Sequence, residues 1–456
     1  MTNTQTVTLD GGAPASRAYV VGISAVAAIS GLLFGYDTAI INGALMFLRG
    51  EFRLSDFQTE IAAGSLLVGC LAGASAAGTL SDHYGRKRLM LVASVLFCVS
   101  SLGTALPRTL LEFTLARFVA GTAIGVASVL APLYIAEVSP AAIRGRLVTL
   151  NQMAIVTGIL LSYFVSWVLS GLGPVSWRWM FASAGVPSGI LFVSLPFIPE
   201  SPRWLVKQSR LSEAMVTLRR VNGDVAAASE AASISESLST ETGSLRELLE
   251  PRLRRPLAIA ILLAVFQQIT GINTVIYYGA ILFREHGGQA SASSAIGANV
   301  TIGAMNFLCT MFAVMFIDRI GRKPLLLVGS AGMAISLGAL AFAFRMTPVP
   351  ATLILTLVLC YVAFFAIGLG PGVWVYISEL FPTAVRGRAM SAATLCLWGA
   401  CLAVTLSFLT LVQHLGAAGA FACYAGVCIV TFLFVWRFTP ETKARTLEQI
   451  QEFWRK

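Results

Sequence analysis

The sequence predicts an all-α polytopic membrane protein with twelve transmembrane helices in two pseudo-symmetric bundles of six. Three observations predict this fold class: the hydrophobic composition, the placement of the basic residues and an internal duplication. Of the 456 residues, 56% are hydrophobic and only 12% are charged, a balance typical of chains that span membranes several times. We therefore expect most of the apolar surface to face a lipid bilayer.

Twelve apolar runs are long enough to cross that bilayer, because a spanning helix needs about 20 mostly apolar residues. Several runs contain Gly or Pro, which membrane helices tolerate where neighbouring helices satisfy the backbone. In chain order the runs lie near 18–43, 58–81, 88–106, 110–136, 147–170, 178–198, 257–283, 296–317, 324–344, 352–377, 389–413 and 417–438.

The basic residues fall in alternate loops. The net charge of +10 would suit a nucleic-acid-binding protein, but 25 of the 32 Lys and Arg lie on one side of the predicted membrane. Basic loops stay in the cytoplasm, so the chain is predicted to be a multi-pass protein of the cell membrane with both termini cytoplasmic. The basic balance is thus a topology signal, and nucleic acid is not an expected partner.

Three motifs occur twice at nearly one spacing. Each copy follows the same helix of its half, and the offsets are 236, 242 and 241 residues. The pairs are 82–87 with 318–323, 137–146 with 379–388, and 199–201 with 440–442. Two six-helix halves in parallel repeat, with a binding site between them at mid-membrane, are typical of transporters.

The duplication divides the chain into five predicted parts. The parts are a polar cytoplasmic tail (1–17), an amino-terminal bundle (18–200), a cytoplasmic helical linker (201–255), a carboxy-terminal bundle (256–438) and a second cytoplasmic tail (439–456). The linker has helix-like stretches near Leu211–Val221 and Ala226–Leu249. A solvated connection and a small helical cap are equally compatible with its composition.

Asp37 is the only acidic residue of the first apolar run. A carboxylate at bilayer depth is costly and is read first as part of an ion pathway. Arg117 is the nearest basic candidate inside another run. Its charge would favour the ionised carboxylate while burial would favour the protonated one, so a small change in access could switch Asp37. A purely structural buried ion pair is the alternative.

Charged residues repeat at the predicted cytoplasmic helix ends. For any one of them, a topological signal with helix capping is the simpler explanation. As a repeated set they predict ion pairs that form across the halves in one conformation and part in another. The set comprises Arg86, Glu137 and Arg144 in the first half, and Arg322, Glu379 and Arg386 in the second.

Side-chain amides and aromatic rings in the apolar runs predict a sugar site. Amides provide donors and acceptors for hydroxyl groups, and rings stack on the C–H faces of a sugar. Hydrogen bonding between helices is the alternative use of these amides. The polar candidates are Gln152, Gln267, Gln268, Asn273, Tyr277 and Asn306, and the aromatic candidates are Phe34, Phe365, Trp374 and Trp398.

Six motifs make the chain resemble the sugar porter family of the major facilitator superfamily, which includes bacterial sugar–proton symporters and facilitative glucose transporters. The resemblance covers essentially the whole chain after the amino-terminal tail. The motifs are GLLFGYD at 31–37, GTLSDHYGR at 78–86, PESPRWL at 199–205, QQITGIN at 267–273, GPGVW at 370–374 and PETK at 440–443. The resemblance implies the major facilitator fold and sugar transport by alternating access.

The resemblance also implies roles for individual residues. The implied sugar ligands are Gln152, Gln267, Gln268, Asn273, Asn306 and Trp374, with Phe34, Phe365, Gly370 and Trp398 in the same pocket. Tyr277 and Tyr278 would belong to an extracellular gate. The cytoplasmic ion-pair network would contain Arg86, Glu137, Arg144, Arg322, Glu379 and Arg386.

Two positions bear on the cargo. Leu397 stands where the family often has Asn or Gln, so one hydroxyl contact is predicted to be lost or rearranged. Ile159 is apolar where some pentose carriers have an amide, which favours a hexose such as glucose. Symporters of the family resemble this chain in carrying an acid at Asp37, where uniporters commonly have an amide. We therefore expect proton-coupled sugar import, with protonation of Asp37 freeing Arg117.

Several alternatives stay open within and beyond transport. They are a proton-independent sugar facilitator and a polyol– or inositol–proton symporter. An enzyme is disfavoured because the apolar runs contain no metal-ligand cluster or nucleophile–base pair. A non-transporting sugar sensor is improbable because only a short tail follows the last run. The expected partners are a sugar, a proton and the lipid bilayer, with no cofactor and no metal, and the chain is expected to be a monomer.

Overall fold

The computed structural model describes residues 17–140, 143–239, 248, 250–286, 291–346, 349–381 and 383–443. All regular secondary structure in these ranges is helical. The first half contains α1 (Arg17–Phe52), α2 (Asp56–Tyr84), α3 (Arg86–Ala105), α4 (Leu110–Val138), α5 (Arg144–Leu169), the 3-10 turn η1 (Ser170–Val175), α6 (Ser176–Ser183), α7 (Gly185–Ser194) and the 3-10 turn η2 (Leu195–Phe197).

The second half follows three short helices. These connecting helices are α8 (Pro202–Lys207), α9 (Leu211–Asn222) and α10 (Asp224–Ser239). The second half contains α11 (Pro251–Ile269), α12 (Ile272–His286), α13 (Ala292–Ile320), α14 (Arg322–Ala343), α15 (Ala351–Ile367), α16 (Leu369–Leu380), α17 (Thr383–Thr405) and α18 (Phe408–Phe438).

The described helices provide twelve segments able to cross a membrane, as predicted. Within the described ranges, eleven helical segments are long and apolar enough to cross a bilayer. The longest, Arg144–Phe197, has 54 residues, or about 80 Å of helix, whereas a bilayer core is about 30 Å thick. It reverses at Gly173, where φ is 78°, so it contributes two crossings.

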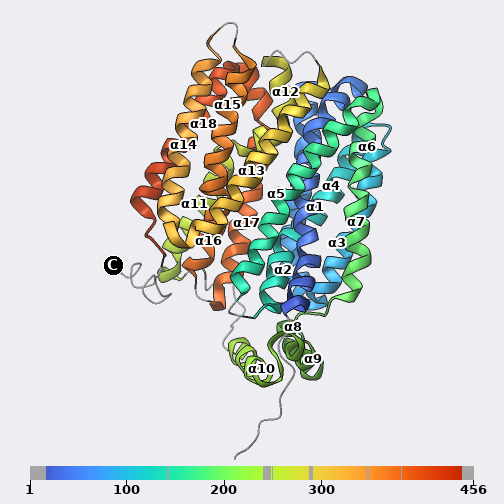
Figure 1. Ribbon diagram of the computed structural model, residues 1–456, viewed down its shortest axis with the longest axis vertical. Helices are drawn as coiled ribbons and strands as arrows, with labels where there is room; N and C mark the ends of the chain where they lie inside the picture. The colour runs from blue at the N-terminus through green and yellow to red at the C-terminus, as the bar shows by residue number, and fades with distance from the viewer. Residues whose placement is uncertain are drawn as a thin grey trace, which may run out of the picture.

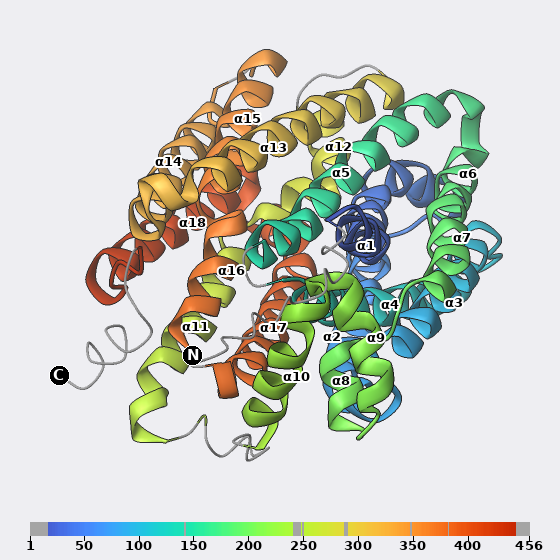
Figure 2. The ribbon, with the colours of Figure 1, turned by 60° about the horizontal axis from the view of Figure 1, so that its bottom comes forward.

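The two halves stand side by side (Figure 1). The blue-to-green helices α1–α7 form one bundle and the yellow-to-red helices α11–α18 form the other, with α5 and α13 running together along their boundary in both ribbon views (Figures 1 and 2). Helices α8–α10 lie beneath one end. We call this end the linker face and the opposite end the far face.

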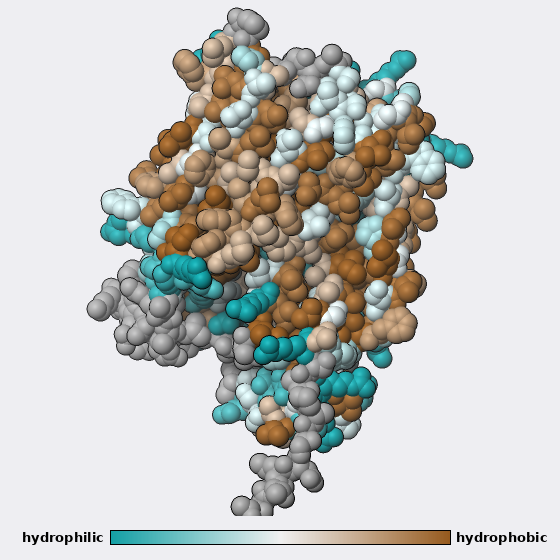
Figure 3. All heavy atoms as spheres, viewed as in Figure 1, coloured by the Kyte–Doolittle hydropathy of each residue, from teal (hydrophilic) through white to brown (hydrophobic). Residues whose placement is uncertain are grey.

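The outer surface of the bundles is apolar, whereas the linker end is polar. Figure 3 shows hydrophobic residues along the visible side of the bundles and hydrophilic ones around α8–α10. Large apolar side chains of α14 are exposed, including Ile335 (73%) and Phe342 (68%). Exposure of this kind is unfavourable in water but matches a hydrocarbon environment.

Corresponding turns in the two halves share one geometry. Gly85 between α2 and α3 and Gly321 between α13 and α14 have φ of 98° and 104°, values that favour glycine. The carboxylate of Glu200 accepts a hydrogen bond from the Arg86 main-chain N–H (3.0 Å). In the second half Glu441 accepts from Arg322 N–H (3.1 Å) in the same way. The duplication seen in the sequence is therefore a structural duplication.

Two predicted runs are broken in the structure. The run 257–283 is divided into α11 and α12 around Gly271, where φ is 93°. The run 352–377 is divided into α15 and α16 at Gly368, whose φ and ψ are −101° and −87°. Breaks at membrane depth leave backbone groups without helical partners, so they are tolerated where protein groups satisfy them.

The boundary between the last two runs lies where the sequence predicts it. The apolar runs predict segments at 389–413 and 417–438, and a non-helical residue separates them at Gly416, where φ is 70°. Gly173 has the same left-handed φ between the corresponding segments of the first half. An additional interruption, which composition does not reveal, separates α17, ending at Thr405, from α18, beginning at Phe408.

The described part of the linker 201–255 contains the three helices α8, α9 and α10. Helix α9 covers the predicted stretch 211–221, and α10 covers the first part of the predicted stretch 226–249. Residues 240–247 and 249 lie outside the described residues, as do the tails 1–16 and 444–456. Trp204, Leu205 and Ala214 form a small buried core between α8 and α9.

Candidate functional site

The GLLFGYD motif lies where α1 crosses α5. A Cβ at Gly35 would come within 1.9 Å of the Ile155 carbonyl oxygen, and one at Gly158 within 2.1 Å of the Leu32 carbonyl oxygen. The glycines therefore let the two backbones touch, as small residues do between membrane helices. This close crossing positions Phe34 and Asp37 on α1.

Asp37 and Arg117 are brought together as predicted, but not as an ion pair. Both side chains are described, and they are 5% and 0% exposed. The Arg117 Nη1–H donates to the main-chain oxygen of Asp37 (3.1 Å), and its guanidinium lies 5.6 Å from the centre of the Phe181 ring. No ion pair joins the Asp37 carboxylate to Arg117 in the structure.

The Arg117 guanidinium is incompletely satisfied. Its Nε and Nη2 groups are buried and make no hydrogen bond within the protein. Unpaired N–H groups of a buried cation are costly. A carboxylate moving toward Arg117 would relieve this cost, so the arrangement favours an approach of Asp37 in another state.

The predicted amide ligands of α11 and α12 form one hydrogen-bonded chain. The Gln267 amide donates to the main-chain oxygens of Leu369 (2.7 Å) and Gly370 (3.0 Å), at the start of α16 just after the break at Gly368. The Gln268 amide donates to the Gln267 side-chain oxygen (3.2 Å). Asn273 donates in turn to Gln268. Gln267 thus makes hydrogen bonds between helices, which is the alternative use of these amides. Its neighbours Gln268 and Asn273 also lie in one cluster with it.

Two aromatic candidates meet across the boundary between the halves. The rings of Phe34 on α1 and Trp398 on α17 have centroids 5.4 Å apart and are inclined at 50°. The Trp398 Nε1–H is buried and makes no hydrogen bond within the protein. A buried indole N–H normally finds a partner, so this donor is available to a ligand.

The remaining predicted ligands come from four other helices. Asn306 on α13 is 8% exposed, and its oxygen accepts from the Thr310 hydroxyl at 3.5 Å. Gln152 on α5, Phe365 on α15 and Trp374 on α16 are half-buried. Gly370, at the start of α16, contributes its carbonyl to Gln267. The predicted ligands therefore come from both halves.

The tyrosines assigned to a gate are held within the second half. The Tyr278 hydroxyl donates to the Thr405 main-chain oxygen (2.9 Å), and its ring stacks on Phe408 at 5.4 Å. The Tyr277 hydroxyl lies 4.0 Å from the Cys401 sulfur. Asn273 also donates to this sulfur (2.9 Å), so Cys401 belongs to the same group although the sequence did not indicate it.

Hydrogen bonds between the halves gather toward the far face. Asn42 on α1 donates to the Ile276 main-chain oxygen (2.8 Å) and accepts from Ala280 N–H (3.0 Å) on α12. Tyr163 on α5 also donates to Ile276 (3.1 Å). Glu60 on α2 accepts two hydrogen bonds from α18. The two halves are therefore fastened together at the far face.

Sequence reasoning missed Asn42, Tyr163 and Glu60. Asn42 and Glu60 are polar residues in or next to apolar runs, and this placement could have indicated that they make buried hydrogen bonds. Their partners are mostly backbone groups of the other half, which the sequence does not identify. Tyr163 gave no signal, because a tyrosine in an apolar run is ordinary.

The charged residues of the linker face pair within their own halves. Arg86 donates to both oxygens of Glu137 (3.0 and 3.1 Å), and Arg322 donates to Glu379 (2.7 Å). Arg144 lies 3.8 Å from Glu230 of α10. None of these three contacts joins one six-helix half to the other at this face. The predicted pairs across the halves are thus apart in this structure.

Arg386 and Arg144 occupy equivalent positions at their helix starts. Arg386 donates to the Phe381 main-chain oxygen (3.3 Å) and Arg144 to the Ser139 main-chain oxygen (3.4 Å). Pro382, which the sequence places between Glu379 and Arg386, lies outside the described residues. Both guanidinium groups thus contact the main chain of the segment that precedes their own helix.

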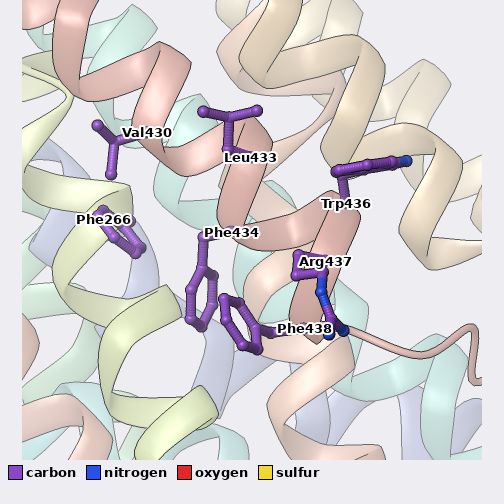
Figure 4. Close-up of a pocket in the computed structure, with 7 residues that line it drawn as sticks. All are labelled: Phe266, Val430, Leu433, Phe434, Trp436, Arg437 and Phe438. Atoms are coloured by element: carbon purple, nitrogen blue, oxygen red, sulfur yellow. The ribbon is translucent and has the colours of Figure 1, made fainter.

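A separate groove lies on the outer surface and is not part of this site. Figure 4 shows it between α11 and α18, near the linker face. Leu433 and Trp436 in this groove are more than half exposed, so they face the bilayer. The groove contains none of the predicted sugar ligands and is lined by Phe266, Val430, Leu433, Phe434, Trp436, Arg437 and Phe438.

Comparison with known proteins finds relatives along the whole chain. The model of the family described as "Sugar (and other) transporter" matches residues 23–454. An arabinose-proton symporter of Bacillus subtilis is 38% identical over 446 residues, covering 96% of each chain. A glucose transport protein of Synechocystis is 38% identical over 456 residues, covering 95% of this chain and 97% of that protein.

Solved structures agree with the fold. The inward-open conformation of the xylose transporter XylE from E. coli is 34% identical and superimposes with a TM-score of 0.83. The match covers 95% of this chain and 100% of that one. Together with the duplicated turns and the family match, this likeness shows that the chain belongs to the sugar porter family of the major facilitator superfamily and is a multi-pass membrane transporter rather than an enzyme.

Proposed function

We propose that the protein imports a monosaccharide together with a proton by alternating access. The observation that carries the proposal is the buried Arg117, whose two unpaired N–H groups lie beside Asp37. Protonated Asp37 has no charge to offer Arg117, and ionised Asp37 would pair with it. Loss of the proton would therefore change the contacts between α1 and α4, which is how a bound proton could bias a two-state carrier.

The sugar would bind at the boundary between the halves. Trp398 and the amide chain of Gln268 and Asn273 provide donors and acceptors, and Phe34 provides a flat apolar face. Because these residues come from both halves, a bound sugar would draw the halves together. Such contact with both halves couples binding to closure, as alternating access requires.

The size of the sugar is the less defined part of the proposal. We favour a hexose because Ile159 is buried and apolar at 6% exposure. The relatives include an arabinose-proton symporter and a glucose transport protein, so a pentose is the direct competitor. Uptake of labelled glucose, xylose, arabinose and inositol into vesicles, each competed by the others, identifies the cargo. Preference for a pentose would overturn the hexose assignment.

The linker face is proposed to be cytoplasmic. Most of the basic residues lie on this side, which is the positive-inside pattern. With the far face fastened and the linker-face ion pairs confined to single halves, the structure would correspond to an inward-facing state. Thiol labelling of cysteines added at each face of the protein in whole cells measures this orientation.

The decisive experiment uses Asp37→Asn. The amide keeps the shape of the side chain but binds no proton, so accumulation of sugar against its gradient is expected to fall to equilibrium. Exchange of internal for external sugar should continue, because exchange needs no net proton movement. Thr38→Val, which removes a neighbouring buried hydroxyl without changing charge, is the matched control and should still accumulate sugar.

A proton-independent facilitator is the competing function. It predicts that sugar added to energised vesicles does not alkalinise the medium and that Asp37→Asn equilibrates sugar at the rate of the wild-type protein. A wild-type protein that never concentrates sugar, even with an imposed pH gradient, would replace symport by facilitation.

A further inference from the structure

Glu60 is a buried carboxylate that the proposed proton and sugar steps do not use. It lies on α2 near the far face and is 0% exposed. One carboxylate oxygen accepts from the main-chain N–H of Thr410 (2.9 Å), and the other accepts from the Thr410 hydroxyl (2.9 Å). Because α2 belongs to the first half and α18 to the second, this double contact joins the halves.

The amino terminus of α18 lacks a cap from its own half. Ser407 occupies the cap position but makes no capping hydrogen bond; its hydroxyl donates backward to the Ala403 oxygen (2.7 Å). The first N–H groups of a helix need acceptors and carry partial positive charge. Thr410 is the third residue of α18, so Glu60 supplies from the other half the acceptor that an N-cap side chain usually supplies.

The packing around Glu60 supports a direct contact between the halves. Gly64 follows one helical turn later on the same face of α2. A Cβ at Gly64 would lie 2.6 Å from a Leu406 methyl carbon, so α2 rests closely on the turn that begins α18. We call Glu60, Gly64 and Thr410 the far-side latch.

We propose that the far-side latch holds the far face closed and sets the balance between the two facing states. This inference rests on alternating access in the proposed function. Closed, the latch satisfies both the carboxylate and the end of α18. Open, water satisfies both, so neither state leaves a charge unpaired. Glu60 is then a gate-positioning residue that touches neither sugar nor Asp37.

Four variants separate the contributions to the latch. Glu60→Ala removes both hydrogen bonds. Glu60→Gln keeps an acceptor for the N–H and a donor toward the hydroxyl but removes the charge at the helix end. Thr410→Val removes only the hydroxyl bond, and Thr410→Ser restores it. We expect the far face to open most in Glu60→Ala and less in Thr410→Val and Glu60→Gln. Thr410→Ser should open about as little as the wild-type protein.

Hydrogen–deuterium exchange of the full chain in nanodiscs measures the opening without sugar or a proton gradient. Glu60→Ala is expected to raise the ratio of far-side-open to far-side-closed protein about a hundredfold or more, the loss of two hydrogen bonds to a charged group. Exchange should then rise in 56–66 and 406–412. It should fall in 144–150 and 385–392 at the linker face, because opening one face closes the other.

Each result decides the proposal. Reciprocal changes at the two faces support the latch. Unchanged far-side exchange overturns it, and faster exchange at 406–412 without protection of the linker face makes Glu60 a local cap only. If Glu60→Ala fails to fold, Thr410→Val provides the same readout with α2 intact. Reciprocal exchange in a protein that moves no sugar would refute the proposed function while leaving the latch in place.

Discussion

At the scale of single residues, the main finding is a buried cation without its predicted partner. The sequence identified Asp37 and Arg117 as neighbours, and the structure places Arg117 on the main-chain oxygen of Asp37 instead of its carboxylate. Because Arg117 is buried, a small movement of α1 against α4 changes how many of its N–H groups have a hydrogen-bond acceptor. A proton at Asp37 is the simplest way to select between such arrangements.

Trp398 gives a prediction at the same scale. Its indole N–H is buried without a hydrogen bond in the protein, so we expect it to bond a sugar hydroxyl. Trp398→Phe should raise the KM for the transported sugar about three- to tenfold, the value of one neutral hydrogen bond, with little change in kcat. Trp436→Phe, on the bilayer-facing surface with 60% exposure, should leave KM unchanged. An unchanged KM in Trp398→Phe would show that the indole N–H does not bond the sugar.

At the scale of helices, close crossings decide which residues reach the boundary between the halves. The glycines of the GLLFGYD motif lie against the α5 backbone, so the motif is first a packing surface and only then a carrier of Asp37. The breaks between α11 and α12 and between α15 and α16 also position side chains at this boundary. They turn main-chain oxygens toward Gln267, which fixes the neighbouring amides in place.

Two glycine substitutions on α1 test the importance of the crossing. Gly35→Ala puts a Cβ within 1.9 Å of the Ile155 oxygen, whereas a Cβ at Gly22 has no neighbour within 4 Å. Since both sites are helical, Gly22→Ala should be neutral or slightly stabilising. Gly35→Ala should lower the thermal midpoint by several degrees and reduce transport at least tenfold, because overpacking displaces α5. Equal effects in purified protein would contradict this reading.

At the scale of the whole molecule, the two halves share one topology, but their equivalent ion pairs are buried to different extents. Arg86 and Glu137 are 7% and 6% exposed as side chains, whereas Arg322 and Glu379 are 11% and 27% exposed. Equivalent hydroxyls complete each group: Ser201 donates to Glu137 (2.5 Å) and Thr442 to Glu379 (2.6 Å). The first half therefore holds its pair further from water.

This difference in burial predicts that equivalent substitutions in the two halves lower the stability of the protein by different amounts. Glu137→Gln leaves a buried guanidinium without its carboxylate and should cost about 3 kcal/mol, as broken buried pairs do. Glu379→Gln should cost about 1 kcal/mol, because Glu379 is itself partly exposed to water and Arg322 keeps its ion pair with Asp318. Thermal midpoints in one detergent, ranked against the wild-type protein, provide the comparison. A larger loss in Glu379→Gln would show that exposure does not set the cost.

Much of the fold and of the candidate site follows from the sequence. Helix number follows from the length of the apolar runs, because every backbone group in a bilayer must be satisfied within a helix. The parallel repeat follows from motif spacing, and the neighbourhood of Asp37 and Arg117 from the cost of burying either charge alone. Local chemistry is sufficient for these conclusions, and they needed no knowledge of which helices touch.

Other features were decided only by the tertiary structure. Which face is fastened depends on Asn42, Tyr163 and Glu60 meeting backbone groups more than 100 residues away, and backbone partners leave no trace in residue type. The missing Asp37–Arg117 ion pair likewise reflects how α1 and α4 pack within the first half. A carrier has at least two such arrangements of nearly equal free energy. One sequence therefore encodes both, and only a particular packing of the halves selects one.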